Sequence, residues 1–475
     1  MAHSPTRFND SLRTDMNKGR SPTKQRANVA NPLTEHLVPY MDPAQLAASM
    51  RYEPLRQPGF VLGSGFERKI ELELRDQHYW PTSVHQELAD SIQIMLRHGL
   101  DKRNPLNQAE RVRINTIAGA GNLDPESNQS LRCEVSGCVV SGITGVGKSA
   151  TIKRMLSVMG PQIVMHTRSE VAGWSRLLQV TYLFIDFPAQ PTRGGLYAAI
   201  LGELDRVLGT SYVNELRRQR DLEAKSALVT RLLSMHRVGL LVVDENQQST
   251  LDAATWGDVF VNYFIRLMNI GIPVLLSGNP LAFTNLAASA QLARRFAKAG
   301  WYELVPAASA NVSWWCSEYV PGAMRFSVFK DVPKVAEVVD ATFGGCAGVP
   351  AFFMEWWAEA QSRALKRSPN GNRLTVADIV DASKSPRIKP LLKIAQAISS
   401  GNFAAEYGDL PRAPSPGRGD PGSGAKRGRL HGRSAEYEKE AMKHSKQESR
   451  ASRVSERSVQ RMVEEATREK IISRP

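Results

Sequence analysis

The chain has 475 residues, of which 42% are hydrophobic, and a formal net charge of +14. This length predicts about three domain-sized pieces rather than one core. No stretch of about 18 uninterrupted apolar residues is present, so we expect no membrane span. The N-terminus lacks the apolar core of a signal peptide, and the four cysteines form no CxxC pair. Together these features favour a cytoplasmic protein with reduced thiols and without a zinc site.

The positive charge is concentrated near the two ends of the chain. Residues 411–475 hold 16 Lys/Arg and 9 Asp/Glu, and residues 1–39 hold 6 Lys/Arg and 3 Asp/Glu. Basic tails bind nucleic acid without sequence preference and in a salt-dependent way, so we expect an acidic partner such as DNA. The alternative is that these segments serve solubility alone.

Composition and hydrophobic periodicity divide the chain into five regions. Residues 1–45 are polar and basic, which predicts a disordered tail. Residues 46–125 predict a small helical extension, and residues 126–305 alternate between strand and helix patterns. That alternation indicates an α/β fold with a parallel sheet and helices on both faces. Residues 306–406 are mainly helical in pattern, and residues 407–475 begin with a Pro-, Gly- and Arg-rich linker, which predicts a second disordered basic tail.

A glycine-rich segment, GITGVGKS at 142–149, has the spacing of a phosphate-binding loop. The apolar run 135–141 before it predicts a buried strand, and residues 150–159 after it have helical spacing. Lys148 is predicted to contact the β- and γ-phosphates of ATP, and the Ser149 hydroxyl to bind Mg²⁺ at the start of the helix. The predicted phosphate-binding set is Gly142, Ile143, Thr144, Gly145, Val146, Gly147, Lys148, Ser149 and Ala150.

A basic cluster lies just before the helix that leads into the next motif. It consists of Arg217, Arg218, Arg220 and Lys225. Such a cluster is a candidate for contacts with the DNA backbone, which position a protein without reading bases. A solvated helix face explains the same residues equally well.

An acidic pair, Asp244 and Glu245, ends the apolar run 238–243. Buried parallel strands have this pattern, and ligands of such sheets bind at the carboxyl ends of the strands. We therefore expect Asp244 beside the phosphate loop, where it supports Mg²⁺, and Glu245 in position to polarise the attacking water. A carboxylate directly after the metal ligand suits hydrolysis better than phosphate transfer to a second substrate.

A third strand is predicted at 272–277, followed by Gly-Asn-Pro at 278–280. Asn279 is the candidate for contact with the γ-phosphate or the water, and Ser277 is the alternative. A turn explains Gly-Asn-Pro equally well. Downstream, Arg294 and Arg295 are candidates for an arginine that reaches the γ-phosphate of a neighbouring subunit, with a solvated basic pair as the alternative.

The order of these motifs resembles the AAA+ ATPases. Three further parts of the sequence resemble the TnsC/TniB group of transposition regulators, and TnsC more closely. They are YWP at 79–81 with RHGLDKRNP at 97–105, QVTYLFIDFP at 179–188 with GGL at 194–196, and LDRVLGTSY at 204–212. The resemblance covers roughly residues 70 to 360.

This resemblance implies an AAA+ ATPase core at 126–305 and a helical lid at 306–406. It implies binding of ATP and Mg²⁺, homo-oligomeric rings or helical filaments on double-stranded DNA, and a link between a target-selection protein and a transposase, which the C-terminal tail contacts. It further implies a bacterial, nucleoid-associated protein whose hydrolysis of ATP controls assembly. Lys148, Ser149, Asp244 and Glu245 match the family's ATPase positions directly, and Asn279, Arg294 and Arg295 match them less closely.

The sequence departs from the AAA+ pattern in the lid. The stretch 344–350 has the Gly-Pro opening of the last lid helix but no arginine, which argues against nucleotide sensing by a lid arginine. Trp356 and Trp357 are predicted to lie in the core or an interface. Two other functions fit the ATPase motifs: another DNA machine such as a helicase loader or initiator, and an ATP switch or scaffold that does not hydrolyse.

Overall fold

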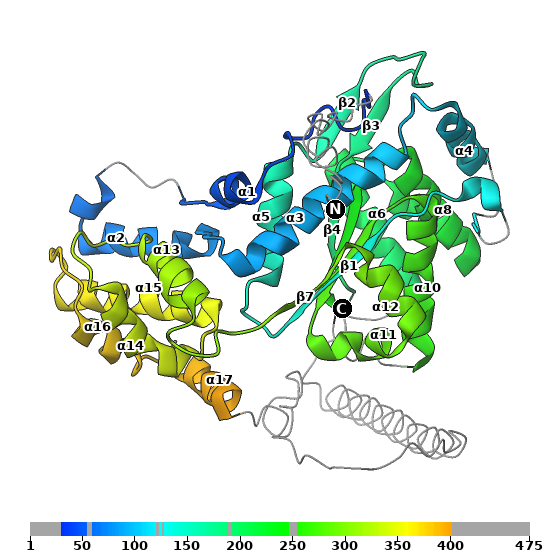
Figure 1. Ribbon diagram of the computed structural model, residues 1–475. Coiled ribbons are helices and arrows are strands. Elements are labelled where there is room, and N and C mark those ends of the chain that lie inside the picture. Colours follow the sequence, from blue (N-terminus) through cyan, green and yellow to red (C-terminus); the bar gives the residue numbers. More distant parts are fainter. Residues whose placement is uncertain are drawn as a thin grey trace, which may run out of the picture. The chain divides into compact units, whose positions relative to one another are not determined.

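The computed structural model describes residues 30–54, 59–119, 123–125, 128–188, 192–246 and 254–400 (Figure 1). The predicted tail at 407–475 lies outside these ranges, as does the first part of the predicted tail at 1–45. Within the described ranges, no single helix is long and apolar enough to cross a membrane, although one bent helix pair, at Val335–Cys346 and Pro350–Arg367, passes that test by length and composition.

A five-stranded parallel sheet forms the centre of the fold. Its strands are β1 (Gly137–Gly142), β4 (Tyr182–Asp186), β5 (Leu240–Asn246), β6 (Val274–Gly278) and β7 (Trp301–Leu304). Their order is β4-β5-β6-β1-β7, and each neighbouring pair is parallel. The three strands predicted around the motifs are therefore adjacent. The predicted α/β fold with a parallel sheet is therefore confirmed.

Four strands beyond the three predicted around the motifs appear in the described residues. β4 and β7 form the two edges of the sheet, and β2 (Ile163–His166) and β3 (Leu177–Val180) form a separate antiparallel pair. Each of the four has only four or five residues, which is too short for a clear alternating pattern.

Helices cover both faces of the sheet, and alternating side chains of each strand contribute to two different cores. Cys138 and Val140 of β1 belong to the core shared with α3, α5 and the lid, whereas Val139 belongs to the core shared with α6, α8 and α10. Figure 1 shows these two groups of helices on opposite sides of the sheet. The helices of the ATPase core are α5 (Lys148–Met159), α6 (Arg193–Leu208), α7 (Tyr212–Arg218), α8 (Leu222–Met235), α10 (Ala254–Ile270), η4 (Pro280–Phe283), α11 (Thr284–Ala288), α12 (Ala290–Phe296) and η5 (Ala297–Ala299).

The N-terminal extension is helical and packs on the ATPase core. Its helices are α1 (Pro43–Met50), η1 (Phe60–Leu62), α2 (Gly65–Glu71), η2 (Leu72–Gln77), α3 (Ser83–Lys102), α4 (Gln108–Gly119) and η3 (Gln129–Leu131). The prediction of a disordered tail up to residue 45 is wrong for residues 30–45. Leu33, Leu37 and Met41 are buried in the core, and they recur every four residues within a polar segment that masks their periodicity.

The lid is a helical bundle, as its sequence pattern predicts. It contains a π-helical turn at Trp314–Tyr319 (η6), α13 (Val320–Met324), α14 (Val335–Cys346), α15 (Pro350–Arg367), α16 (Val376–Ala382) and α17 (Lys389–Ser400). Trp356 and Trp357 are buried, and their indole N–H groups donate to the carbonyls of Ile379 and Phe326, each at 2.8 Å. Both tryptophans are therefore core residues.

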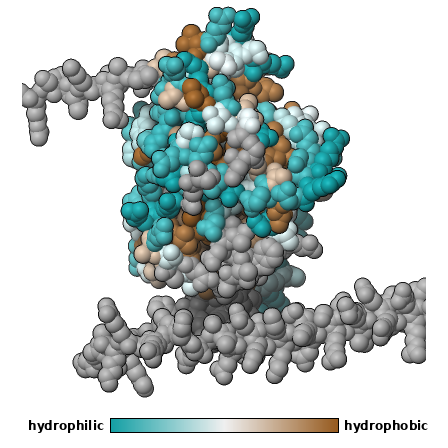
Figure 2. All heavy atoms as spheres, turned by 90° about the vertical axis from the view of Figure 1, so that its right-hand side faces the viewer, coloured by the Kyte–Doolittle hydropathy of each residue, from teal (hydrophilic) through white to brown (hydrophobic). Residues whose placement is uncertain are grey.

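The face of the molecule that carries α4, α8 and α10 is mostly hydrophilic. Figure 2 shows apolar side chains there only as small separate groups among the residues drawn in colour. Scattered apolar side chains of this kind are normal on a protein surface.

Candidate active site

The carboxyl ends of three neighbouring strands meet at one cavity. The phosphate loop follows β1, Asp244 and Glu245 lie at the end of β5, and Asn279 follows β6. These residues line a cavity of about 910 Å³. Because parallel strands place their carboxyl ends at the same edge of the sheet, segments more than 100 residues apart in sequence form one site.

The phosphate loop has the backbone geometry that its glycines allow. Gly145 and Gly147 have φ angles of 83° and 97°, in the left-handed region that favours glycine. Gly142 is packed so closely that an added Cβ atom would lie 2.5 Å from the Leu304 carbonyl oxygen. Gly147 is the N-cap of α5, so the first N–H groups of that helix face the cavity, where they suit an anion.

Lys148 lies over the loop. Its Nζ donates to the carbonyl oxygens of Gly142 and Ile143, at 2.7 and 2.9 Å. Burial lowers the pKa of this amine, and the nearby Asp244 carboxylate opposes that shift. Lys148 therefore holds a partly desolvated positive charge at the place where a triphosphate would bind.

The two acidic residues of β5 differ in environment. Asp244 is 2% exposed, whereas Glu245 is exposed and has a φ of 56°. The pairing of β5 with β6 shifts register between Val243 and Asn246, so the chain bulges at the pair. A left-handed backbone costs about 1–2 kcal/mol for a residue other than glycine, and such strain gathers at functional sites. The bulge turns Glu245 into the cavity beside the buried Asp244.

The donor set fits a nucleotide with its magnesium ion. Loop N–H groups and Lys148 suit the phosphates, while the Ser149 hydroxyl and the Asp244 carboxylate are oxygen ligands of the kind that Mg²⁺ prefers. The ion would supply charge neutralisation at the phosphates, and Ser149 and Asp244 would hold it.

Asn279 lines the cavity, and Ser277 is fully buried within β6. The Asn279 side chain also accepts a hydrogen bond from the Leu281 backbone N–H at 3.0 Å, and thereby caps the short helix η4. The turn function and the site function predicted for Asn279 are therefore compatible, and of the two candidates Asn279 is the one among the described residues that line the cavity.

The two candidate arginines lie on α12, outside the lining of the cavity as the described residues define it. Arg295 is half-buried, and its Nη1 donates to Asn269 Oδ1 at 3.3 Å. Arg294 is exposed to solvent. Neither candidate arginine is therefore placed to act on the nucleotide of its own chain.

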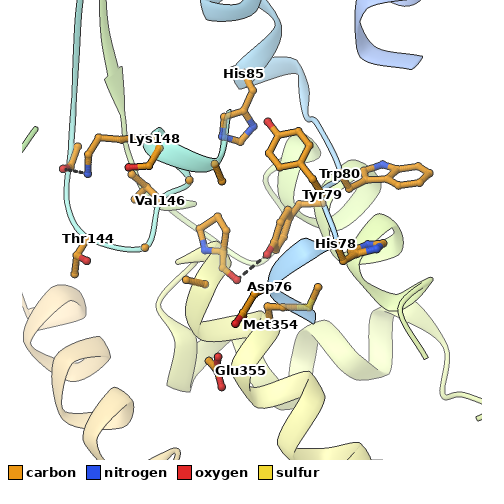
Figure 3. Close-up of a pocket in the computed structure, with 18 of the residues that line it drawn as sticks. Asp76, His78, Tyr79, Trp80, His85, Thr144, Val146, Lys148, Met354 and Glu355 are labelled. Atoms are coloured by element: carbon orange, nitrogen blue, oxygen red, sulfur yellow. Dashed lines mark hydrogen bonds between the residues drawn. The ribbon is translucent and has the colours of Figure 1, made fainter. Parts of the chain in front are cut away.

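The rest of the cavity wall comes from two regions that the motifs did not indicate. Figure 3 shows the phosphate loop on the left of the cavity, the N-terminal extension above and to the right, and the lid residues Met354 and Glu355 below. The extension supplies Arg75, Asp76, His78, Tyr79, Trp80 and His85, and the lid supplies Tyr319, Ala323, Pro350, Ala351, Met354 and Glu355. Of these, only YWP at 79–81 and the Gly-Pro opening of α15 were conspicuous in the sequence.

The lid reaches the phosphate loop through its backbone. The Ala351 N–H donates to the Gly145 carbonyl at 3.0 Å, at the first turn of α15. Among the described residues, the one arginine in the lining of the cavity is Arg75 of η2. That arginine comes from the N-terminal extension rather than from the lid.

The predicted basic cluster lies away from the cavity. Arg217, Arg218 and Arg220 are exposed at the end of α7 and just after it, and Lys225 is half-buried in α8. The three arginines are thus accessible to a large anionic partner.

The comparisons with known proteins agree with this geometry. Residues 136–286 match a family model described as an AAA domain, about a third of the chain. A search of curated protein sequences found no significant match.

Several solved structures are similar at low sequence identity. The ORC1 protein of Aeropyrum pernix in complex with DNA is 16% identical, covers 59% of this chain and 68% of its own, and gives a TM-score of 0.35. Cdc6p of Pyrobaculum aerophilum is 13% identical over 79% of this chain and 87% of its own, with a TM-score of 0.35. A Walker-type ATPase of Pyrococcus abyssi is 15% identical over 56% of this chain and 69% of its own, with a TM-score of 0.34.

The fold, the site and the AAA domain match over residues 136–286 identify an ATPase with a P-loop α/β fold of the AAA+ kind. Its described core carries the phosphate loop and the acidic pair on neighbouring strands of a parallel sheet, and it catalyses the hydrolysis of ATP.

Proposed function

We propose that this ATPase assembles as a homo-oligomer on double-stranded DNA, connects target selection to a transposase, and hydrolyses ATP to control its own assembly, as a TnsC-like regulator. One observation supports the proposal that the protein forms a homo-oligomer: Arg294 lies outside the cavity of its own chain. The exposed arginine on α12 is presented to solvent, where a second copy can receive it.

The geometry of the cavity supports the following roles for its residues. Lys148 and the loop N–H groups bind the triphosphate, and Ser149 and Asp244 hold Mg²⁺. Glu245 orients and polarises the attacking water, and Asn279 contacts the γ-phosphate or that water. Arg294 of a neighbouring subunit stabilises the charge that develops in the transition state.

The DNA role is supported by charge and exposure. Arg217, Arg218 and Arg220 are exposed on one short segment, and the chain carries a net charge of +14. Contacts from several subunits of an oligomer would follow the phosphate backbone without reading bases. Such binding falls steeply with salt because counterions are released.

The role in transposition is supported by the resemblance of roughly residues 70–360 to the TnsC/TniB group. Two of the segments that carry it, 79–81 and 97–105, belong to the extension that packs on the ATPase core. The transposase and the target-selection protein are the partners that this resemblance implies, and residues 407–475 are the proposed contact to the transposase.

Electron microscopy of the purified protein tests the assembly. The protein is imaged in negative stain with and without duplex DNA, and with and without a non-hydrolysable ATP analogue. Rings or helices that need both DNA and nucleotide support the proposal. Particles that are indifferent to both contradict it, and a defined complex on one DNA sequence only would instead indicate an initiator.

A further inference from the structure

The N-terminal extension contacts the phosphate loop directly, through the imidazole of His85. This residue is 6% exposed and lines the cavity beside the loop. A Cβ atom added to Gly147 would lie 3.4 Å from His85 Nε2, and the ring hydrogen-bonds with the Val146 backbone. Figure 3 shows His85 pointing from α3 toward the loop that carries Val146 and Lys148.

The protonation of His85 is set by its surroundings. Burial lowers the pKa of His85 to about 4, so the ring is neutral and carries one N–H group. The Val146 backbone opposes this shift in pKa. Nδ1 lies 2.8 Å from the Thr82 hydroxyl, and Nε2 faces Gly147 of the loop. The contact with Thr82 thus fixes the orientation of the ring against the loop.

A second contact from the same segment reaches the same glycine. The Tyr79 hydroxyl donates to Thr151 Oγ1 at 3.0 Å, and Thr151 Oγ1 donates to the Gly147 carbonyl at 2.8 Å. Tyr79 and His85 therefore support Gly147 from two directions, one through its carbonyl and one through the preceding peptide. This glycine is the N-cap of α5, and its orientation sets the direction of the loop N–H groups.

The lid is connected to this arrangement by Glu318. Ser83 is the first residue of α3, and its backbone N–H and hydroxyl donate to the two carboxylate oxygens of Glu318, at 2.5 and 3.0 Å. Thr82 occupies the N-cap position of α3, but its hydroxyl pairs with His85. Glu318 of the lid thus does the capping that an N-cap side chain ordinarily does, and a carboxylate is favoured at that helix end.

We propose that His85 is a positioning residue of the ATPase reaction, which fixes the Val146–Gly147 peptide of the phosphate loop, and that Glu318 makes this support depend on the position of the lid. When the lid moves, the start of α3 loses its cap, and the segment from Tyr79 to His85 is free to shift against the loop. The affinity for nucleotide then responds to lid position without an arginine on the lid. This inference rests on the ATPase activity alone and is independent of the role in transposition.

The test compares His85→Phe, which removes both ring nitrogens, with His85→Gln, which keeps an N–H donor. Binding of a fluorescent ATP analogue, steady-state KM and kcat, and the melting temperature without nucleotide are measured for each. The matched control is His98→Gln, which alters an exposed histidine of the same helix. We expect His85→Phe to weaken nucleotide binding about tenfold, with a rise in KM and a smaller change in kcat, and His85→Gln to recover most of the loss.

Glu318→Ala supplies the second arm of the test and does not place a new group in the loop. We expect this variant to bind the nucleotide more weakly than wild type. The double variant, Glu318→Ala with His85→Phe, should bind about as well as His85→Phe alone, because both substitutions act through the same contact with the loop. If the losses of nucleotide affinity in the two single variants add fully in the double variant, the link between His85 and the lid is overturned. Wild-type nucleotide affinity in His85→Phe, or a melting temperature that falls while affinity stays constant, would overturn the positioning role. A wild-type protein that binds the analogue but does not hydrolyse ATP would instead contradict the ATPase assignment.

Discussion

Arg75 of the N-terminal extension and Glu355 of the lid form an ion pair across the wall of the nucleotide cavity, with 3.0 Å between Nε and Oε1. The arginine side chain is 11% exposed and the glutamate side chain 30% exposed. Residues 280 positions apart in sequence therefore join the extension to α15 at the site itself. The pair helps to enclose the nucleotide between two regions that flank the ATPase core.

Breaking this pair is expected to weaken nucleotide binding. Arg75→Ala and Glu355→Gln should each lower the affinity for an ATP analogue about fivefold, which corresponds to ~1 kcal/mol for a partly buried pair. The double variant should bind no worse than Arg75→Ala alone, because the loss of Arg75 already breaks the pair with Glu355 along with its contacts to Glu73 and Asp76. The exposed pair of Arg168 and Glu170 is the matched control, and its removal should leave affinity unchanged. Independent, additive losses at Arg75 and Glu355 would show that the pair does not act as a unit.

The acidic pair of β5 predicts a separation between nucleotide binding and turnover. Glu245→Gln should lower kcat about a hundredfold or more, because the side chain can no longer polarise the water. Nucleotide binding and assembly should persist, since Lys148, Ser149 and Asp244 are unchanged. Phosphate release and filament lifetime on DNA are the measurements, with Glu303→Gln at an exposed position of β7 as the control. Assembly and disassembly as in wild type would mean that hydrolysis is irrelevant to the cycle.

The buried His85 predicts a pH dependence of stability. Its pKa is about 4 in the folded protein and about 6.5 in an unfolded chain. Between these values the unfolded state binds the additional proton, so the free energy of unfolding falls as the pH drops from 6.5 toward 4, by up to about 3 kcal/mol. His85→Gln should therefore flatten the decline in melting temperature between pH 7.5 and 5 by more than His98→Gln does, because burial also lowers the pKa of the more exposed His98 but less far. Parallel pH profiles for wild type and His85→Gln would argue against a neutral, buried imidazole.

The exposed arginines around the end of α7 predict salt-dependent DNA binding. Replacement of Arg217, Arg218 and Arg220 by alanine should weaken binding to all duplex sequences alike. If each arginine meets one phosphate, the slope of log affinity against log salt should fall by about 3. Arg168→Ala, at another exposed position, is the control. An unchanged slope would place the DNA contacts elsewhere in the chain.

The sequence was sufficient to predict which segments form the centre of the site. The loop at 142–149 and the pair Asp244-Glu245 each follow a buried strand, and local pattern is enough to identify such strands. The adjacency of β1, β5 and β6 then brings the motifs together, as the rule for parallel sheets predicts. The sequence left Asn279 and Ser277 as two candidates at the end of the third strand. Only the structure shows that Asn279 lines the cavity.

The walls of the cavity could not be predicted in the same way. Arg75, His85 and Glu355 lie in helices whose periodicity indicates which side chains are buried but not which residues they contact. The contact between Arg75 and Glu355 joins residues 280 positions apart in sequence. The left-handed backbone of Glu245 has no local sign either, since it arises from a register shift against β6. The boundary of the predicted N-terminal tail was misplaced because Leu33, Leu37 and Met41 are buried among residues that are distant in sequence.

The central claim is that the active site is completed by a second copy of the chain, and mixed oligomers test it most directly. Arg294→Ala subunits lack the arginine, and Glu245→Gln subunits lack the group that polarises water, so each variant alone should hydrolyse ATP poorly on duplex DNA. An equal mixture should recover activity at about a quarter of the subunit interfaces, where an intact Glu245 faces an intact Arg294. The same mixture with Arg295→Ala in place of Arg294→Ala identifies which arginine acts. Recovery on mixing is the predicted result, and a mixture no more active than the average of its two components would contradict the account.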